Sequence, residues 1–171
     1  MAENPDYREL LQHLNDFQVE YLIVGGYALM KCSEPRFTKV LDIWVHDTPE
    51  NAVRVHQALQ RFGAPLAKDR ITPETFAQSH VVYQIGIAPV RVDISDRTGV
   101  QFVQAWTNRV PGTLFRISVQ FISLYDLKAN KRAWLGMSIW SNSSTFLNRN
   151  SVILRNSVLH LARYSSSTRI R

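Results

Sequence analysis

Two apolar stretches separated by a glycine pair constrain the fold of this 171-residue chain more than any other feature. Residues 21–24 read Tyr-Leu-Ile-Val, Gly25 and Gly26 follow, and residues 40–45 read Val-Leu-Asp-Ile-Trp-Val. Short apolar runs bounded by turn residues are typical of buried strands. Residues 27–32, between the two runs, have a helical pattern. We therefore predict a strand, a tight turn, a helix and a second strand, in that order.

Capping residues and periodicity predict the remaining elements. Helices are predicted over residues 5–17, 48–62, 100–110 and 123–134, with a short one from Thr72, and strands over residues 81–87, 90–94 and 114–121. Thr48 and Thr72 are each followed by proline, which is typical of a helix start, and Gly63 is a helix stop. Helices and strands are interleaved, so the predicted class is α/β or α+β, with a small mixed β-sheet flanked by helices.

The distribution of charge divides the chain. Residues 1–126 hold all 14 acids and 12 of the 20 Lys and Arg, whereas residues 127–171 hold eight bases and no acid. We predict one domain over residues 1–135 and a basic extension, rich in Ser, Asn and Arg, over residues 136–171. The extension could be partly disordered, form one amphipathic helix, or bind RNA or DNA phosphates. A frameshifted end would explain the same change in composition.

The sequence also indicates where the protein works. No apolar run approaches the roughly 20 residues that span a bilayer. The first six residues are polar and acidic, unlike a signal peptide. Cys32 is the only cysteine, which excludes an internal disulfide and argues against a cysteine-based metal site. We therefore expect a soluble cytoplasmic protein with no membrane partner.

Two acids on apolar strands are the main candidates for chemistry. Alternation places Asp42 on the same face of its strand as Val40. Asp93 is likewise a single acid near the end of an apolar strand, Val-Arg-Val-Asp-Ile-Ser at residues 90–95. A buried carboxylate needs a partner. On neighbouring strands the two acids could together hold Mg²⁺ through oxygen ligands. The alternative is an ion pair, with Arg91 or Arg97 as the partner of Asp93.

Two further groups could contact phosphate. Gly25 and Gly26 lie between a strand and a helix, where the backbone can approach an anion closely and the helix offers unpaired N–H groups. Lys128 and Lys131 share a face of the helix predicted over residues 123–134. The simpler interpretations are a tight turn for the glycines and a solvated surface for the lysines.

These pieces together resemble the polymerase-beta-like nucleotidyltransferase superfamily, in the bacterial and archaeal branch related to abortive-infection toxins and minimal nucleotidyltransferases. The resemblance rests on the glycine pair, residues 36–44, Asp93 and the segment Phe-Ile-Ser-Leu-Tyr-Asp-Leu-Lys-Ala-Asn-Lys-Arg-Ala at 121–133, and covers about residues 5–134. It implies the nucleotidyltransferase fold and Mg²⁺-dependent transfer of a nucleoside monophosphate from a nucleoside triphosphate (NTP) to an acceptor hydroxyl. The acceptor would be RNA, such as tRNA, or protein. The setting would be toxin–antitoxin or phage defence, with an antitoxin as partner.

The resemblance also implies roles for individual residues. Those that would contact the nucleotide are Gly25, Gly26, Lys128 and Lys131. Asp42 would be the second metal-binding carboxylate, and Asp93 the third, which binds metal or activates the acceptor. Val40 stands where the signature has its first metal-binding Asp. Because valine cannot ligate a cation, catalysis is expected to be weaker by roughly two to four orders of magnitude. The alternative is a catalytically silent protein that binds a nucleotide or a partner.

Overall fold

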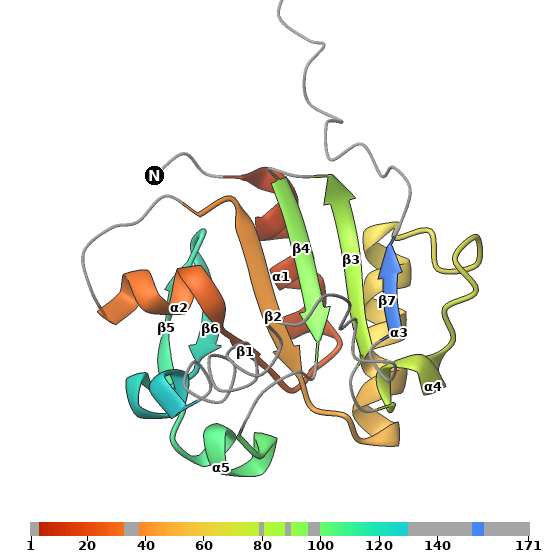
Figure 1. The fold of residues 1–171 in the computed structure, drawn as a ribbon. Helices are drawn as coiled ribbons and strands as arrows, with labels where there is room; N and C mark the ends of the chain where they lie inside the picture. Colours follow the sequence, from red (N-terminus) through yellow and green to blue (C-terminus); the bar gives the residue numbers. More distant parts are fainter. Residues whose placement is uncertain are drawn as a thin grey trace, which may run out of the picture.

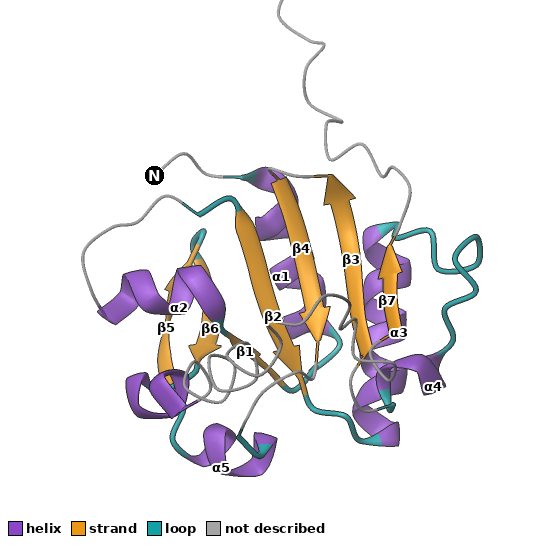
Figure 2. Cartoon of the chain, in the orientation of Figure 1, coloured by secondary structure: helices purple, strands orange, loops and turns teal. Residues whose placement is uncertain are grey.

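A mixed β-sheet forms the centre of the protein (Figures 1 and 2). The computed structural model describes residues 4–32, 38–78, 81–87, 90–95, 100–129 and 152–155. Within these residues the sheet has seven strands in the order β5-β6-β1-β2-β4-β3-β7. Their bounds are β1 Tyr21–Ile23, β2 Val40–Val45, β3 Val81–Ile87, β4 Val90–Ser95, β5 Val110–Leu114, β6 Ile117–Phe121 and β7 Val152–Arg155.

Helices cover both faces of this sheet (Figure 1). Their bounds are α1 Pro5–Asp16, α2 Gly25–Cys32, α3 Pro49–Phe62, α4 Pro73–Phe76 and α5 Phe102–Thr107, and residues 124–129 are also helical. β2 pairs antiparallel with β1 and parallel with β4, so the sheet is mixed. The predicted class, α/β or α+β with a mixed sheet flanked by helices, is therefore confirmed. None of the helices in the described ranges is both long and apolar enough to cross a bilayer.

The strands alternate between an apolar face and a more polar one. Leu41 and Ile43 of β2 and Ile94 of β4 are almost completely buried and belong to the main core. This is the face that α1 and α3 cover, while α2 lies on the opposite face (Figure 1). Asp42 and Asp93 project from that opposite face, because successive side chains of a strand point to opposite sides. The fold therefore brings both acids to the side where α2 begins.

Local capping chemistry sets the ends of the longer helices, as the sequence predicts. The side chain of Asn4 accepts hydrogen bonds from the first-turn N–H groups of α1. Thr48 caps α3, and Gly63 ends it with a φ of 90°. The helix after β1 begins at Gly25, two residues earlier than the pattern predicts. Gly25 and Gly26 are therefore the first two residues of α2, not a turn that precedes it.

Replacing the α3 cap should cost a small, measurable amount of stability. The Thr48 hydroxyl accepts a hydrogen bond from the Asn51 N–H at 3.3 Å. We expect Thr48→Ala to lower the free energy of unfolding by about 1 kcal/mol, the usual cost of losing such a cap. Urea denaturation would measure this. Gln60→Ala, on the exposed side of α3, is the control and should change stability by less than about 0.5 kcal/mol. Equal values for the two variants would contradict the capping role.

The largest difference from the predicted elements lies between residues 107 and 121. The helix predicted to reach Val110 ends at Thr107, and Val110–Leu114 forms β5, which pairs antiparallel with β6. Phe115 and Arg116 make the turn, with positive φ angles of 49° and 64°. Two-residue hairpin turns with positive φ usually carry Asn or Gly. This turn has neither residue, so the sequence does not predict it.

The C-terminal third also differs from the sequence pattern, which suggested an amphipathic helix that includes Val152 and a helix over residues 123–134 with Leu124, Leu127 and Trp134 on one side. Val152–Arg155 forms β7, parallel to β3, where the sequence suggested part of an amphipathic helix. The rest of the extension over residues 136–171 lies outside the described residues. In the helix at 124–129, Leu124 is exposed, whereas Asp126 is fully buried. Asp126 accepts hydrogen bonds from Ser123 and Asn108, and these local partners turn it inward in place of Leu124.

Candidate functional site

The two acids singled out in the sequence are neighbours in the sheet. β2 and β4 pair in parallel, with Asp42 opposite Asp93 and Val40 opposite Arg91. Paired residues on adjacent strands point to the same face, and adjacent strands lie about 4.8 Å apart. These four side chains therefore form a compact group on one face of the sheet. We call Asp42 and Asp93 the carboxylate pair.

Asp42 lies where ionisation of its carboxyl group is unfavourable. Burial and then the nearby charge of Asp93 raise the pKa of Asp42 to about 6, and a hydrogen bond from the Gly26 N–H and the charge of Arg91 oppose this rise. In the part of the chain that the structure describes, no ion pair involves Asp42. A buried carboxylate of this kind is costly to ionise and favours any cation that can reach it.

Asp93, in contrast, is held by an arginine. Arg91 donates from Nε to one Asp93 oxygen at 2.6 Å and from Nη2 to the other at 2.8 Å. Gln84 on β3 adds a longer bond of 3.3 Å from Nε2. The ion pair that the sequence offered as the alternative to a metal is therefore present, with Arg91 as the partner. Arg97 lies outside the described residues.

The glycine pair allows α2 to begin directly against β2. Gly25 has a φ of +60°, and a Cβ built on it would lie 2.7 Å from Cγ of Asp42. A Cβ on Gly26 would lie 2.8 Å from Cβ of Thr38. A larger residue at either position would therefore push α2 away from the strand. The Gly26 N–H donates a hydrogen bond to the Asp42 carboxylate. One of the unpaired N–H groups at the start of α2, which could otherwise bind an anion, is therefore bonded to Asp42.

The structure gives less support to the two lysines. Lys128 is exposed on the helix at residues 124–129, and Lys131 lies outside the described residues. The Ile122 N–H donates to the Ile23 carbonyl at 3.1 Å. The chain that leads into this helix therefore runs beside the end of β1, next to the glycine pair. Lys128 is thus on an element that begins close to the site, and within the described residues no contact joins it to the carboxylate pair.

Tyr7, which no sequence pattern singled out, lies at the start of both β2 and β4. The Tyr7 hydroxyl lies within hydrogen-bond distance of the carbonyl oxygens of Lys39 and Arg91, at 3.0 Å from the latter. Burial raises the pKa of Tyr7, and the neighbouring Tyr27 adds to the rise. In the sequence Tyr7 is only one more apolar position of a helix. In the structure it fixes the backbone just before Val40 and at Arg91.

The carboxylate pair fits a divalent cation in chemistry, with one obstacle. Mg²⁺ prefers oxygen ligands and commonly uses one or two carboxylates plus water and substrate phosphates. Asp42 can offer its carboxylate directly, whereas both oxygens of Asp93 are occupied by Arg91. The described residues contain no group of three or more His, Cys, Asp or Glu side chains arranged to hold a metal. Within the described residues, a metal bound here would have the two carboxylates of Asp42 and Asp93 as ligands.

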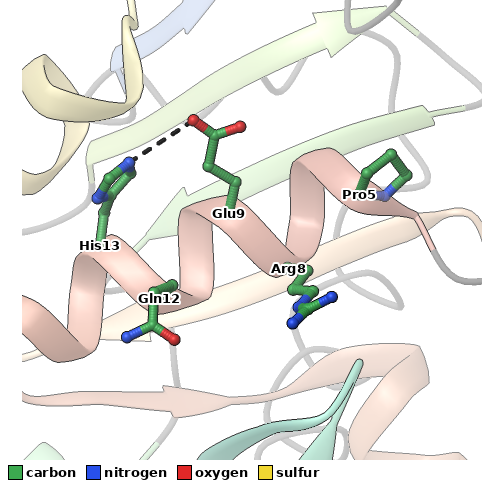
Figure 3. A pocket seen from close by; sticks show the side chains of 5 residues that line it. All are labelled: Pro5, Arg8, Glu9, Gln12 and His13. Carbon is green, nitrogen blue, oxygen red and sulfur yellow. Dashed lines mark ion pairs between the residues drawn. The ribbon is translucent and has the colours of Figure 1, made fainter. Parts of the chain in front are cut away.

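An open hollow lies elsewhere on the surface, along the outer side of α1 (Figure 3). It has a volume of about 620 Å³ and is lined by Pro5, Arg8, Glu9, Gln12 and His13. Four of these residues, Pro5, Arg8, Glu9 and Gln12, are exposed. α1 and α2 lie on opposite faces of the sheet (Figure 1). The hollow is therefore separate from the carboxylate pair.

The candidate site thus combines the carboxylate pair, Arg91 and the glycine-led start of α2. Its polar groups come from α2, from β2, which follows α2 in the chain, and from the more distant β4, and they meet on one face of the sheet. No protein-family model, no curated protein and no solved structure matches this chain.

Proposed function

We propose that this is a nucleotidyltransferase-like protein that binds an NTP at the carboxylate pair and transfers its nucleoside monophosphate to an acceptor hydroxyl. The acceptor oxygen bonds to the α-phosphorus, the bond from that phosphorus to the leaving pyrophosphate breaks, and the hydroxyl proton passes to solvent. The observation that supports this most is the register of Asp42 with Asp93, beside a helix that opens with Gly25 and Gly26. The order of these parts along the chain is that of the polymerase-beta-like superfamily. Without such register the two acids would be unrelated surface or core residues.

Each residue has a definite task in this proposal. Asp42 and Asp93 hold Mg²⁺, which when bound neutralises charge on the transferred phosphoryl group. With a pKa of about 6, Asp42 is largely ionised at neutral pH, as a metal ligand must be. The N–H groups at the start of α2 face the phosphates, and Lys128 and Lys131 are candidates for a further phosphate contact.

We place the protein in the cytoplasm, in a toxin–antitoxin or phage-defence setting, with an antitoxin as its partner. The acceptor is RNA, such as tRNA, or protein. Val40 lowers the rate in this proposal, since it presents an apolar side chain beside Asp42 where the superfamily signature has a further carboxylate. Two carboxylates hold a cation less firmly than three, so the expected loss is roughly two to four orders of magnitude.

The test is transfer of label from an α-labelled NTP, with Mg²⁺, to tRNA and to the proteins of a cell extract. We expect weak labelling by the natural sequence and labelling at least about 100-fold stronger by Val40→Asp, because this variant restores a third oxygen ligand. Asp42→Ala should abolish labelling. Asp16→Ala, an exposed acid of α1, is the control and should leave labelling unchanged. Full labelling by Asp42→Ala would contradict the proposed role of the carboxylate pair.

A second candidate function is nucleotide or partner binding without turnover. The bidentate Arg91–Asp93 ion pair favours it, because it neutralises one of the two carboxylates that catalysis needs. This candidate predicts saturable NTP binding and no labelled acceptor with the natural sequence. Labelling by Val40→Asp but not by the natural sequence would support this candidate. It would mean that the fold is intact and that catalysis is absent because of the residue at position 40. A labelled acceptor formed by the natural sequence would exclude it.

A further inference from the structure

Arg91 occupies a distinctive place beside the carboxylate pair. It is the register partner of Val40, two residues before Asp93 on β4, and it shares the face of the sheet that carries Asp42 and Asp93. Its guanidinium spans both oxygens of Asp93 with bonds of 2.6 and 2.8 Å. A bidentate arginine–carboxylate pair is among the strongest side-chain hydrogen-bonded arrangements. Asp93 therefore has no oxygen without a strong donor.

The charges of the group are unusual for a metal site. Asp42 and Asp93 carry two negative charges, and Arg91 supplies one positive charge to Asp93. A divalent cation that binds to both carboxylates must either displace the guanidinium or lie beside it at a repulsive distance. Val40 offers no carboxylate to offset that repulsion. Arg91 and a metal ion therefore compete for the same ligand.

A metal ion could reach Asp93 if only the Arg91 side chain moved. The Arg91 side chain is 31% exposed, whereas that of Asp93 is only 16% exposed. The guanidinium can turn toward solvent while Asp93 stays in place. The backbone of Arg91 is fixed at the same time, because its carbonyl lies 3.0 Å from the Tyr7 hydroxyl. Displacement would thus involve the arginine side chain and leave β4 unchanged.

We propose that Arg91 sets the divalent-metal affinity of this site, by holding Asp93 until a metal ion displaces the guanidinium. Arg91 is a positioning residue, since it acts through Asp93. The inference rests on the proposed function for the identity of the site. Its test uses metal alone, without nucleotide, so that its failure is distinguishable from failure of the transferase proposal.

The experiment is titration of the protein with Mn²⁺, with free Mn²⁺ followed by electron paramagnetic resonance. Arg91→Gln should bind Mn²⁺ at least about tenfold more tightly than the natural sequence, because it frees both Asp93 oxygens. The gain should disappear in Arg91→Gln/Asp93→Asn. The control for net charge is Arg54→Gln. Arg54 is a partly exposed residue of α3 whose guanidinium donates a hydrogen bond to the Gln18 carbonyl, and its replacement should change affinity less than about twofold.

Arg91→Lys covers the case in which Arg91→Gln fails to fold. Lysine keeps the charge but cannot donate two parallel hydrogen bonds to one carboxylate. It should therefore hold Asp93 less firmly and bind Mn²⁺ more tightly than the natural sequence, though less tightly than Arg91→Gln. Affinity within about twofold of the natural sequence in the folded Arg91 variants would overturn the inference, as would a gain that persists with Asp93→Asn. Neither result would alter the label transfer expected in the NTP assay, which tests the transferase proposal separately.

Discussion

Gly25→Ala should lower the free energy of unfolding by about 3–5 kcal/mol, a large share of the total stability of a small domain. Two costs add at this position. Alanine at a φ of +60° is strained by roughly 1–2 kcal/mol. Its Cβ would also lie 2.7 Å from Cγ of Asp42, so the helix start or the strand must shift. Urea denaturation at neutral pH measures the loss.

Gly63→Ala is the matched control, because it measures the cost of alanine at a positive φ without the cost of a steric clash. Gly63 also has a positive φ, of 90°, but a Cβ there would meet no atom within 4 Å. We expect a loss of about 1–2 kcal/mol from strain alone. Gly25→Ala/Asp42→Ala should recover part of the loss of Gly25→Ala, because it removes the carboxylate that the new Cβ would touch. Equal losses for the two glycine variants would contradict the close approach of α2 to Asp42.

Asp42→Asn should stabilise the fold at alkaline pH and not at acid pH. The folded protein raises the pKa of Asp42 from 3.8 to about 6, so it binds this proton more tightly than the unfolded chain does. The associated stability is fully present below pH 3.8 and is lost as the pH rises through 6. At about 1.4 kcal/mol per pKa unit, the loss is on the order of 2–3 kcal/mol. Because asparagine cannot ionise, the variant should not lose this stability as the pH rises.

The measurement is the free energy of unfolding at about pH 4, 6 and 8, which spans the titration of Asp42. Asp42→Asn should be close to the natural sequence at the lowest pH and more stable by about 2–3 kcal/mol at the highest. Asp16→Asn, which replaces an exposed acid of α1, should show no such divergence. Lower stability of Asp42→Asn at the highest pH would mean that the carboxylate is paired with a stabilising cation. If Asp42→Asn is more stable than the natural sequence but loses the label-transfer activity, Asp42 is kept for function and not for stability.

Local signals in the sequence predicted much of the fold. The bounds of β2 follow from an apolar run interrupted only by Asp42, and α3 follows from Thr48, Pro49 and Gly63. These signals depend only on residues close together in the chain, so they can be read without the tertiary structure. The hairpin at Phe115 and Arg116 could not be predicted in this way, because its positive φ angles are imposed by the pairing of β5 with β6.

The site itself could be predicted only as a set of alternatives. The sequence indicated that Asp42 and Asp93 lie on apolar strands, and the register of β2 with β4 brings them together. It could not decide between a metal ion and an ion pair, because Arg91 and Asp93 share one face of a strand whichever partner the carboxylate takes, and only the structure shows the bonds between them. Nor could it show that Gly25 is required by contact with the side chain of Asp42, on the next strand of the chain.

The measurement that most directly tests nucleotide binding at the carboxylate pair is nuclear magnetic resonance of the ¹⁵N-labelled protein with an ATP analogue that carries a nitroxide. The nitroxide broadens nearby amide signals, and no metal is needed. We expect broadening to be strongest at Gly25, Gly26 and Asp42 and to be reversed by unlabelled ATP. Broadening confined to the hollow along α1, or to the basic extension at residues 136–171, would contradict the proposed site.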